Sequence, residues 1–454
     1  MTGLPGRSPE PIAAGYFQCG RSCAPRRCAR LHRPHRPARP PEDDTDAALP
    51  TPTKRPKNRK AQIALAAAEL FCARGYHGVG VDEIAGAVGI TGPAIYRHFP
   101  NKYAMLVHAT RELSDTVRTT VDRALADSDD PRTQLDSVLD ALATLSVDQR
   151  RVGGLYQWEN RYLDAAHRAE FRNELGALVG RVAQLVTALR PELSAPVARL
   201  FTRAAFSALA SLATHRAPIS RSRAADLLRR AGWALLTTDV PVPSSLSSVR
   251  PTVPVEPLAG PADPAAGQAD GNNRREAVLA TAIRLFHLHG YHAVGMEDIG
   301  RAAGLHASSL YRYFPSKADL LAAAYHRAAD QLSASTTASL GSAASDQDAL
   351  RGLVESFVDL TFSQRDLVAV YLAENNNLPE RDRHELRKIQ RLQVDEWVRL
   401  LIGVRPELSP SEARVLVHAA LNVVTDLGGS TDPAPPDAFR PVVTALALEP
   451  MRRA

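Results

Sequence analysis

The stretch Ile95-Tyr96-Arg97-His98-Phe99-Pro100-Asn101-Lys102 decides the fold, because it returns 215 residues later as Leu310-Tyr311-Arg312-Tyr313-Phe314-Pro315-Ser316-Lys317. Gly75-Tyr76-His77 returns at the same offset as Gly290-Tyr291-His292. Between residues 58 and 109, 20 of the 52 positions are identical to those 215 residues further on, without a gap. Such self-similarity at one offset indicates a duplicated structural unit.

The duplication reaches well beyond this block. Arg190-Pro191-Glu192-Leu193-Ser194 recurs as Arg405-Pro406-Glu407-Leu408-Ser409, again 215 residues apart. The repeated unit is therefore a whole module and not a short motif. A proline-rich stretch over 239–272 lies between the two copies and is typical of an interdomain linker.

The first copy opens with a predicted amphipathic helix. Ile63, Ala67 and Phe71 recur at helical spacing and place apolar side chains on one face. Gly75 is expected to end this helix in a left-handed conformation, which glycine adopts without steric cost. A second helix is then expected to begin near Gly80.

A glycine separates the second predicted helix from the third. Glu83 is positioned to accept hydrogen bonds from N–H groups in the first turn of the second helix. Gly89 ends that helix, and Thr91 is expected to cap the next one. Ile95 and Phe99 are the expected buried anchors of this third helix.

The second copy has the same pattern, with its turn at Gly304 and its third helix over 306–313. Two helices joined by a short glycine-containing turn form the helix-turn-helix arrangement. The second helix of such a pair is short and exposed enough to enter the major groove of DNA.

These motifs resemble the signature of the TetR/AcrR family of transcription regulators. The resemblance covers about fifty residues in each copy and includes Asp82-Glu83-Ile84-Ala85 and Gly89-Ile90-Thr91. It implies an all-α fold of two tandem modules, each with an N-terminal three-helix head and a C-terminal helical effector and dimerisation domain. It further implies a repressor-like protein that is homodimeric or pseudo-dimeric, with the last two helices of each module forming the dimer contact. Gly80 and Gly295 stand where the family usually carries Ser or Thr, and glycine is a weaker but tolerated cap.

The pattern predicts six segments along the chain. They are a disordered tail over 1–56, a DNA-binding head over 57–105, an effector and dimerisation domain over 106–238, a linker over 239–272, a second head over 273–320 and a second effector domain over 321–454.

The resemblance also implies DNA contacts residue by residue. Phosphate contacts fall to Tyr96, His98, Lys102, Tyr311, Tyr313 and Lys317, with Arg97 and Arg312 beside them. Base contacts fall to the first turn, which is Thr91, Gly92, Pro93 and Ala94 in one copy and His306, Ala307, Ser308 and Ser309 in the other. The alternative for Tyr96 and Tyr311 is that they are partly core aromatics. The base-reading positions differ between the copies, which favours two different half-sites in the operator; neutral drift is the competing explanation.

A mid-domain stretch is the candidate effector site. Its residues are Tyr156, Trp158 and Glu159 in the first module and Tyr371, Glu374 and Asn375 in the second. They could orient a ligand, although structural hydrogen bonds and core packing are the competing roles. The stretch is similar to actinobacterial TetR-type regulators of lipid metabolism, which implies an acyl-CoA-like effector.

Composition places limits on other functions. The net charge of +6 is compatible with operator DNA as partner but does not establish it. Cys19, Cys23 and Cys28 lie near His32 and His35 without the spacing of a usual zinc site, so we expect no metal and no cofactor. No apolar run of membrane-spanning length and no secretory signal is present, which predicts a cytoplasmic protein without membrane contact.

No catalytic motif indicates an enzyme. The runner-up function is a small-molecule sensor or protein-interaction scaffold that has lost DNA binding. The two modules could pair within one chain or across chains, and the linker is long enough for either.

Overall fold

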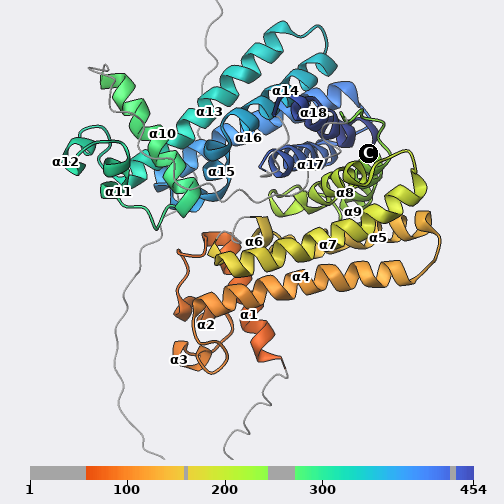
Figure 1. Ribbon diagram of the computed structural model, residues 1–454, viewed down its shortest axis with the longest axis horizontal. Coiled ribbons are helices and arrows are strands. Elements are labelled where there is room, and N and C mark those ends of the chain that lie inside the picture. Colours follow the sequence, from red (N-terminus) through yellow and green to blue (C-terminus); the bar gives the residue numbers. More distant parts are fainter. Residues whose placement is uncertain (1–57, 158–161, 244–270, 430–435) are drawn as a thin grey trace, which may run out of the picture. The chain divides into compact units, whose positions relative to one another are not determined.

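The computed structural model describes residues 58–157, 162–243, 271–429 and 436–454, and each element in these ranges is a helix (Figure 1). The predicted all-α fold is confirmed. The tail over 1–56, with its cysteines, and residues 244–270 of the linker lie outside the described residues, so the predictions made for them are not tested.

Residues 57–238 are called module 1 and residues 273–454 module 2. The helices of module 1 are α1 (Arg59–Arg74), α2 (Val81–Ala87), α3 (Gly92–Ile95), α4 (Lys102–Ala126), α5 (Pro131–Asp148), α6 (Gly154–Gln157), α7 (Ala165–Leu189), α8 (Ala195–Ala210), η2 (Ser211–Ala213) and α9 (Arg221–Leu236).

Module 2 repeats the order of the α-helices. Its helices, the first of which begins in the predicted linker, are α10 (Gly271–His289), α11 (Met296–Ala302), α12 (Ala307–Leu310), α13 (Lys317–Ser342), α14 (Asp346–Ser363), α15 (Arg365–Ala373), η4 (Asn375–Asn377), α16 (Glu380–Val404), α17 (Pro410–Gly428) and α18 (Pro436–Arg453). The 3₁₀ helix η4 differs in its place from η2, because it follows α15.

Each head shares one continuous helix with its effector domain. The Asn101 side chain accepts a hydrogen bond from Ala104 N at 2.8 Å and begins α4, and Ser316 Oγ accepts from Asp319 N at 3.2 Å and begins α13. Both helices run across the divisions expected after residues 105 and 320. A displacement of α4 or α13 in the effector domain therefore reaches the attached head.

Gly75 ends α1 in a conformation that explains why glycine stands there in both copies. Its φ is +79°, as predicted, but its ψ of 151° lies outside the left-handed helical region, in a region that only glycine occupies readily. The equivalent Gly290 has a φ of +78°.

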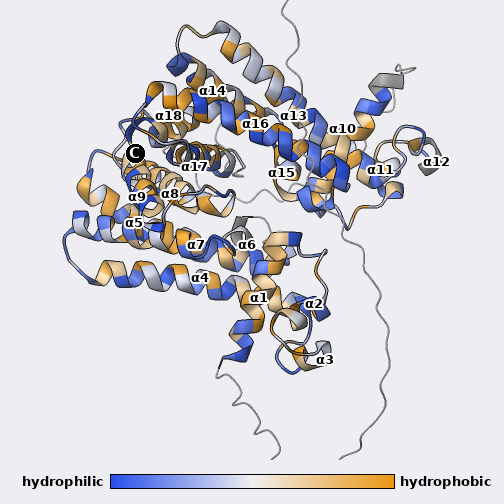
Figure 2. Ribbon diagram, turned by 180° about the vertical axis from the view of Figure 1, so that it is seen from behind, coloured by the Kyte–Doolittle hydropathy of each residue, from blue (hydrophilic) through white to orange (hydrophobic). Residues whose placement is uncertain are grey.

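Apolar side chains of the described residues gather in three cores. The first fills head 1 and includes Phe71, Ile95 and Phe99, which are at most 2% exposed and confirm the predicted anchors. The second fills head 2 around Phe286 and Phe314 and extends into the effector domain of module 2. The third is shared by the effector domains of both modules. Figure 2 shows hydrophilic and hydrophobic residues alternating along the long helices, as expected of amphipathic helices.

The repeated Arg-Pro-Glu-Leu-Ser motif holds the end of each module's last helix. Arg190 Nη1 donates to the carbonyl of Leu236 at 3.3 Å, and the equivalent Arg405 donates to the carbonyl of Met451 at 3.2 Å. The last carbonyls of a helix have no N–H partner within the helix, so side-chain donors such as these satisfy them. This shared role explains why the motif is repeated.

The third core joins α8 and α9 to α17 and α18, which lie side by side in Figure 1. Ser207 Oγ donates to the Asn422 carbonyl at 2.9 Å, and Asn422 Nδ2 donates to the Ser207 carbonyl at 2.7 Å. The two residues are repeat equivalents, 215 positions apart. A residue that contacts its own equivalent lies beside a twofold axis, so these helix pairs are related by a local pseudo-twofold axis.

Candidate nucleic-acid interface

The turn between the second and third helix of each head is built on a glycine with positive φ. Gly89 has a φ of +68° and Gly304 a φ of +67°. Behind each glycine the chain is fixed to the preceding helix, because Ile90 N donates to Ala85 O at 3.0 Å and Leu305 N to Gly300 O at 2.8 Å. The predicted helix-turn-helix geometry is present in both heads.

The recognition helices are shorter than the sequence predicted. α3 and α12 are single turns that end at Ile95 and Leu310. Shorter-range hydrogen bonds carry the chain onward: His98 N donates to Ile95 O at 2.8 Å, and Tyr313 N donates to Leu310 O at 2.9 Å. The residues predicted to contact phosphates therefore lie on a tight turn after the helix.

The predicted base-reading residues of head 1 face outward in part. Thr91 and Pro93 are exposed, Ala94 is half-buried, and Gly92 is buried. Thr91 is the N-cap residue of α3, but its side chain makes no capping hydrogen bond, so the expected cap is absent.

In head 2 the corresponding turn also reaches the surface. His306 and Ser308 are exposed and Ser309 is half-buried, while the side chain of Ala307 lies outside the described set. Both heads thus present the first turn of the recognition helix to the outside.

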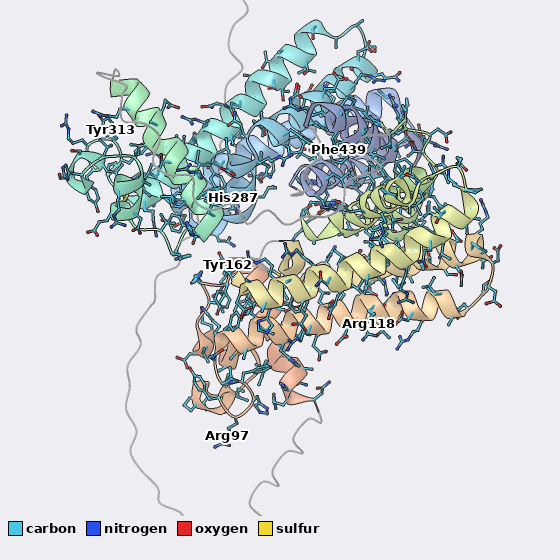
Figure 3. All side chains as sticks on the ribbon, in the orientation of Figure 1. Arg97, Arg118, Tyr162, His287, Tyr313 and Phe439 are labelled. Atoms are coloured by element: carbon cyan, nitrogen blue, oxygen red, sulfur yellow. The ribbon has the colours of Figure 1, made fainter. Side chains whose placement is uncertain are left out.

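Tyr96 and Tyr311, two of the predicted phosphate-contacting residues, lie at the surface. Tyr96 is 56% and Tyr311 51% exposed, so each side chain is accessible from outside its head. Arg97, His98 and Arg312 are exposed as well, and Figure 3 shows Arg97 pointing away from the tip of head 1. Tyr313, labelled in the same figure, is half-buried against the core of head 2 and so differs from its equivalent, His98.

The two predicted lysines have an internal role that the sequence did not reveal. Lys102 Nζ donates to the carbonyls of Tyr76 and Val79 at 2.9 and 3.0 Å, and Lys317 Nζ donates to those of Tyr291 and Val294 at 2.8 Å each. Partial burial lowers the pKa of both lysines. Each ammonium thus fixes the loop after the first helix and keeps one N–H for another partner.

The candidate effector residues are only partly described. Trp158, Glu159 and the side chain of Tyr156 lie outside the described set. In module 2, Tyr371 lies against Tyr325 with ring centroids 4.9 Å apart, and burial raises its pKa to about 12. Asn375 is half-buried at the start of η4.

Glu374 makes structural hydrogen bonds, which is the alternative that the sequence left open. It is fully buried, and it accepts from Tyr291 N at 3.1 Å and from Asn377 Nδ2 at 2.6 Å. Since Tyr291 belongs to head 2, the carboxylate links the effector domain of module 2 to its own head. Its predicted ligand contact is not tested.

Two contacts between the modules were also not predicted from the sequence. The equivalent residues His77 and His292 meet each other, as do Ser207 and Asn422. The constant offset of 215 relates the members of each pair, but it does not show that they meet, because that depends on how the two modules pair.

Neither a metal site nor a membrane segment is found in the part of the chain that the structure describes. No group of three metal-ligating side chains occurs there. No helix there is long and apolar enough to span a bilayer.

Comparison with known proteins matches both heads to one family. The family described as "Bacterial regulatory proteins, tetR family" matches residues 63–109 and 278–324. The HTH-type transcriptional activator FasR of Mycolicibacterium smegmatis is 35% identical over 105 residues, which are 23% of this chain and 48% of FasR. The HTH-type transcriptional repressor KstR2 of Rhodococcus jostii is 29% identical over 139 residues, which are 30% of this chain and 62% of KstR2. The matches thus span less than two thirds of these relatives' length.

Two solved structures also align with part of this chain. A TetR-family regulator from Bordetella parapertussis is 25% identical and aligns with a TM-score of 0.36 over 39% of this chain and 94% of its own. KstR2 of Mycobacterium tuberculosis is 22% identical, with a TM-score of 0.34 over 40% of this chain and 96% of its own. With the family signature matched at two places, this chain belongs to the TetR family of bacterial regulatory proteins and carries two TetR-like modules in tandem.

Proposed function

We propose that the chain is a ligand-responsive transcription regulator whose two heads bind double-stranded operator DNA. The observation that carries the proposal is the exposed face shared by both heads, with Tyr96 and Arg97 on one and Tyr311 and Arg312 on the other. These groups stand at the end of short helices anchored by buried residues, and hydroxyl and guanidinium groups are ordinary partners of phosphate oxygens.

A salt series tests DNA binding. The full chain is titrated with DNA from upstream of its own gene at increasing salt, and affinity should fall steeply because phosphate contacts release counterions. Arg97→Ala and Arg312→Ala should each reduce the slope of log affinity against log salt by about 0.9. Arg118→Ala is the matched control, because Arg118 is an exposed arginine on α4 that pairs with Asp115 (Figure 3).

Absence of binding to any promoter fragment at low salt would contradict DNA binding. It would instead support a sensor or scaffold function. The direction of regulation is a separate question, for which the family resemblance implies repression. A reporter placed behind the bound fragment measures it, and higher expression in the presence of the chain would contradict repression.

The two heads are proposed to read different half-sites. Their phosphate-type residues match at Tyr96 and Tyr311, whereas the exposed first-turn residues differ, with Thr91 in one and His306 in the other. Base edges are read from the first turn of a recognition helix, so different side chains there favour different bases. Base-resolution footprinting should show an imperfect inverted repeat; a perfect one would overturn this point and leave neutral drift as the explanation.

The modules are proposed to act as an intrachain pseudo-dimer. The shared third core and the hydrogen bonds between Ser207 and Asn422 support this pairing. A molar mass of 49.1 kDa in solution is expected. In a background with the four cysteines replaced by serine, Ser207→Cys with Asn422→Cys should form a disulfide within one chain. A disulfide-linked dimer would show pairing across chains instead.

An acyl-CoA-like molecule is the proposed effector, on the basis of the sequence similarity to actinobacterial regulators of lipid metabolism. Tyr371 and Asn375 are the described candidates for contact with it. Binding would favour a helix arrangement in which α4 or α13 carries its head away from groove spacing. Calorimetry with long-chain acyl-CoA and with free coenzyme A tests the ligand class. Lack of heat from either would contradict this effector without affecting the proposed DNA binding.

A further inference from the structure

Among the described residues, two charge pairs cross the interface between the modules, and each has its cation in module 1 and its anion in module 2. Arg203 Nε donates to Asp426 Oδ2 at 3.2 Å, and Arg203 Nη2 donates to the Asp426 carbonyl at 2.9 Å. Arg223 Nε donates to Oε1 of Glu412. These four residues are called the pairing charges.

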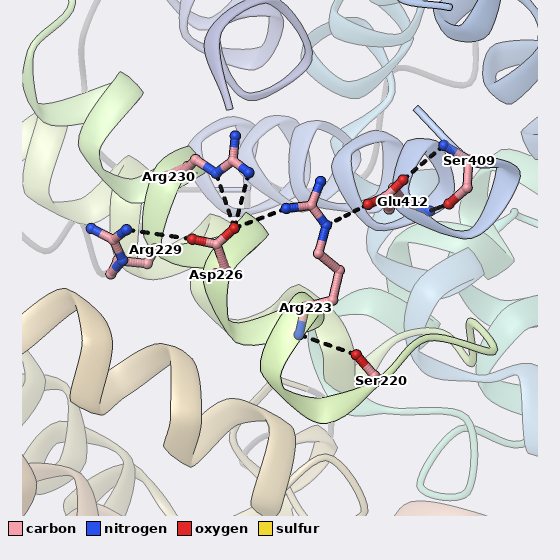
Figure 4. A network of polar contacts seen from close by, with 7 residues as sticks. All are labelled: Ser220, Arg223, Asp226, Arg229, Arg230, Ser409 and Glu412. Carbon is pink, nitrogen blue, oxygen red and sulfur yellow. Dashed lines mark hydrogen bonds and ion pairs between the residues drawn. The ribbon is translucent and has the colours of Figure 1, made fainter. Parts of the chain in front are cut away.

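The second pair is part of a larger fixed network (Figure 4). Asp226 accepts from Arg223 Nη1 at 3.0 Å and from Arg230 Nη2 at 2.9 Å, and so positions the Arg223 guanidinium. On the other side, Glu412 accepts from Ser409 N at 2.7 Å at the start of α17. With Arg223 in place, the Glu412 side chain is only 14% exposed.

None of the pairing charges is conserved between the two copies. For Arg203, Arg223, Glu412 and Asp426 the equivalents 215 positions away are, in order, His418, Ala438, Val197 and Ser211. The repeat therefore carries the cations of these pairs only in module 1 and the anions only in module 2.

The pseudo-twofold axis shows what each charge would meet if like modules paired. In a pair of two modules 1, Arg223 would face Val197 and not a carboxylate. In a pair of two modules 2, Glu412 would face Ala438 and have no cation from the partner module. Both arrangements therefore lose the ion pairs that the observed one provides, and they leave the charged groups facing uncharged side chains.

We propose that the pairing charges select pairing of module 1 with module 2 over pairing of like modules. The inference rests on the proposed pairing of the modules and names the residues that determine its specificity. Partly exposed ion pairs add little stability by themselves. Their effect on specificity is larger, because wrong partners bring like or unpaired charges together.

A charge-reversal experiment in the full chain tests this proposal. One variant carries Arg203→Asp and Arg223→Glu, so all of its pairing charges are acidic; the other carries Glu412→Arg and Asp426→Arg, so all of them are basic. Each variant alone has like charges across its own interface. When the two are mixed, every acidic module can meet a basic module of the other chain.

The mixture should form a complex of twice the 49.1 kDa chain mass. We expect at least about tenfold more of it than in a mixture of differently tagged wild-type chains, since a difference of 1.4 kcal/mol already gives a factor of ten. Combining all four reversals in one chain should restore the single-chain mass, which shows that the reversed residues do not prevent folding.

The matched control reverses a pair within module 1. Arg111 Nη2 lies 2.9 Å from Glu170 Oε2, so Arg111→Glu mixed with Glu170→Arg changes charge without touching the interface and should give no complex. If the pairing-charge mixture stays at the single-chain mass while the fourfold variant folds, the selection proposal is wrong. A disulfide between two chains of the Ser207→Cys, Asn422→Cys variant would instead contradict the intrachain pseudo-dimer and leave the selection by charge standing.

Discussion

His77 and His292 occupy equivalent positions in the two heads, and their ring centroids lie 4.2 Å apart. His77 also lies 4.9 Å from the ring of Tyr162 in module 1, and His292 Nε2 is 2.8 Å from Asn377 Oδ1 in module 2. The heads therefore touch each other at a point that both effector domains also contact.

Replacing His77 with alanine should loosen the spacing between the heads. Aromatic contacts of this kind contribute about 0.5–1.5 kcal/mol beyond burial. Loss of the contact should therefore change the relative position of the heads more than the stability of the fold. Selection from DNA libraries with varied half-site separation should show a broader range of accepted spacings. His287→Ala is the control, because His287 on α10 lies beside Asp366, a residue of its own module. An unchanged spacing preference would show that the contact does not set head separation.

Replacing Lys102 with methionine should both destabilise head 1 and weaken DNA binding. Hydrogen bonds from a charged group contribute about 1.5–3 kcal/mol, and Lys102 donates two of them to the loop after α1. Thermal unfolding measures the first effect, and the salt slope of DNA binding, taken well below the unfolding temperature, measures the second. Arg97→Ala should change the slope without changing stability. A Lys102 variant with normal slope but lower stability would restrict this lysine to its structural role.

Acidification should weaken the interface at His215 and His418, whose rings stack with centroids 4.0 Å apart. Burial, with a smaller effect of Arg414, lowers the pKa of His215 to about 4 and that of His418 well below its usual value. The unfolded chain, with pKa values of about 6.5, therefore binds more protons between pH 4 and 6.5. Stability should be complete above pH 6.5 and decline as the pH falls toward 4, which urea unfolding at several pH values measures.

His215→Phe should reduce this pH dependence while keeping a stacked ring. Both ring nitrogens of His215 are buried without a hydrogen-bond partner in the described structure, so phenylalanine removes polar atoms that burial disfavours. The unfolding midpoint at pH 7 should stay equal or rise. His306→Phe, at an exposed position, should leave the pH dependence as it is. If the stability of His215→Phe declines between pH 7 and 5 as steeply as that of the wild type, the pH dependence arises from other groups.

Replacing Glu374 should uncouple head 2 from its effector domain. In Glu374→Ala the Tyr291 amide loses its acceptor, at a cost of about 1–3 kcal/mol for an unsatisfied buried donor. Hydrogen exchange at the Tyr291 amide should then be at least about tenfold faster. Glu374→Gln keeps an oxygen that can accept the hydrogen bond from the Tyr291 amide. Its exchange rate should therefore lie closer to that of the wild type. Equal exchange in all three proteins would show that the carboxylate does not hold the head.

The sequence predicted the features that both copies share. Gly75 was predicted to have a positive φ and Phe99 to be buried, because a backbone requirement or a core position restricts the residue type in each copy. The same comparison could not reveal Ser207 with Asn422, since these equivalents differ in type. Nor could it reveal Arg223 with Glu412, because a search for identical positions passes over the charges that make the two modules different. The carbonyl partners of Lys102 depend on how a loop folds back, which spacing along the chain does not encode.

The third core has a consequence for gene control at low copy number. A regulator assembled from separate subunits loses its paired form on dilution, because association obeys mass action. Here the residues that pack together, such as Phe201 and Leu416, belong to one polypeptide. Under the proposed intrachain pairing, the number of paired regulators in a cell equals the number of chains translated. Under the same proposal, even a cell that inherits very few copies at division holds all of them in assembled form.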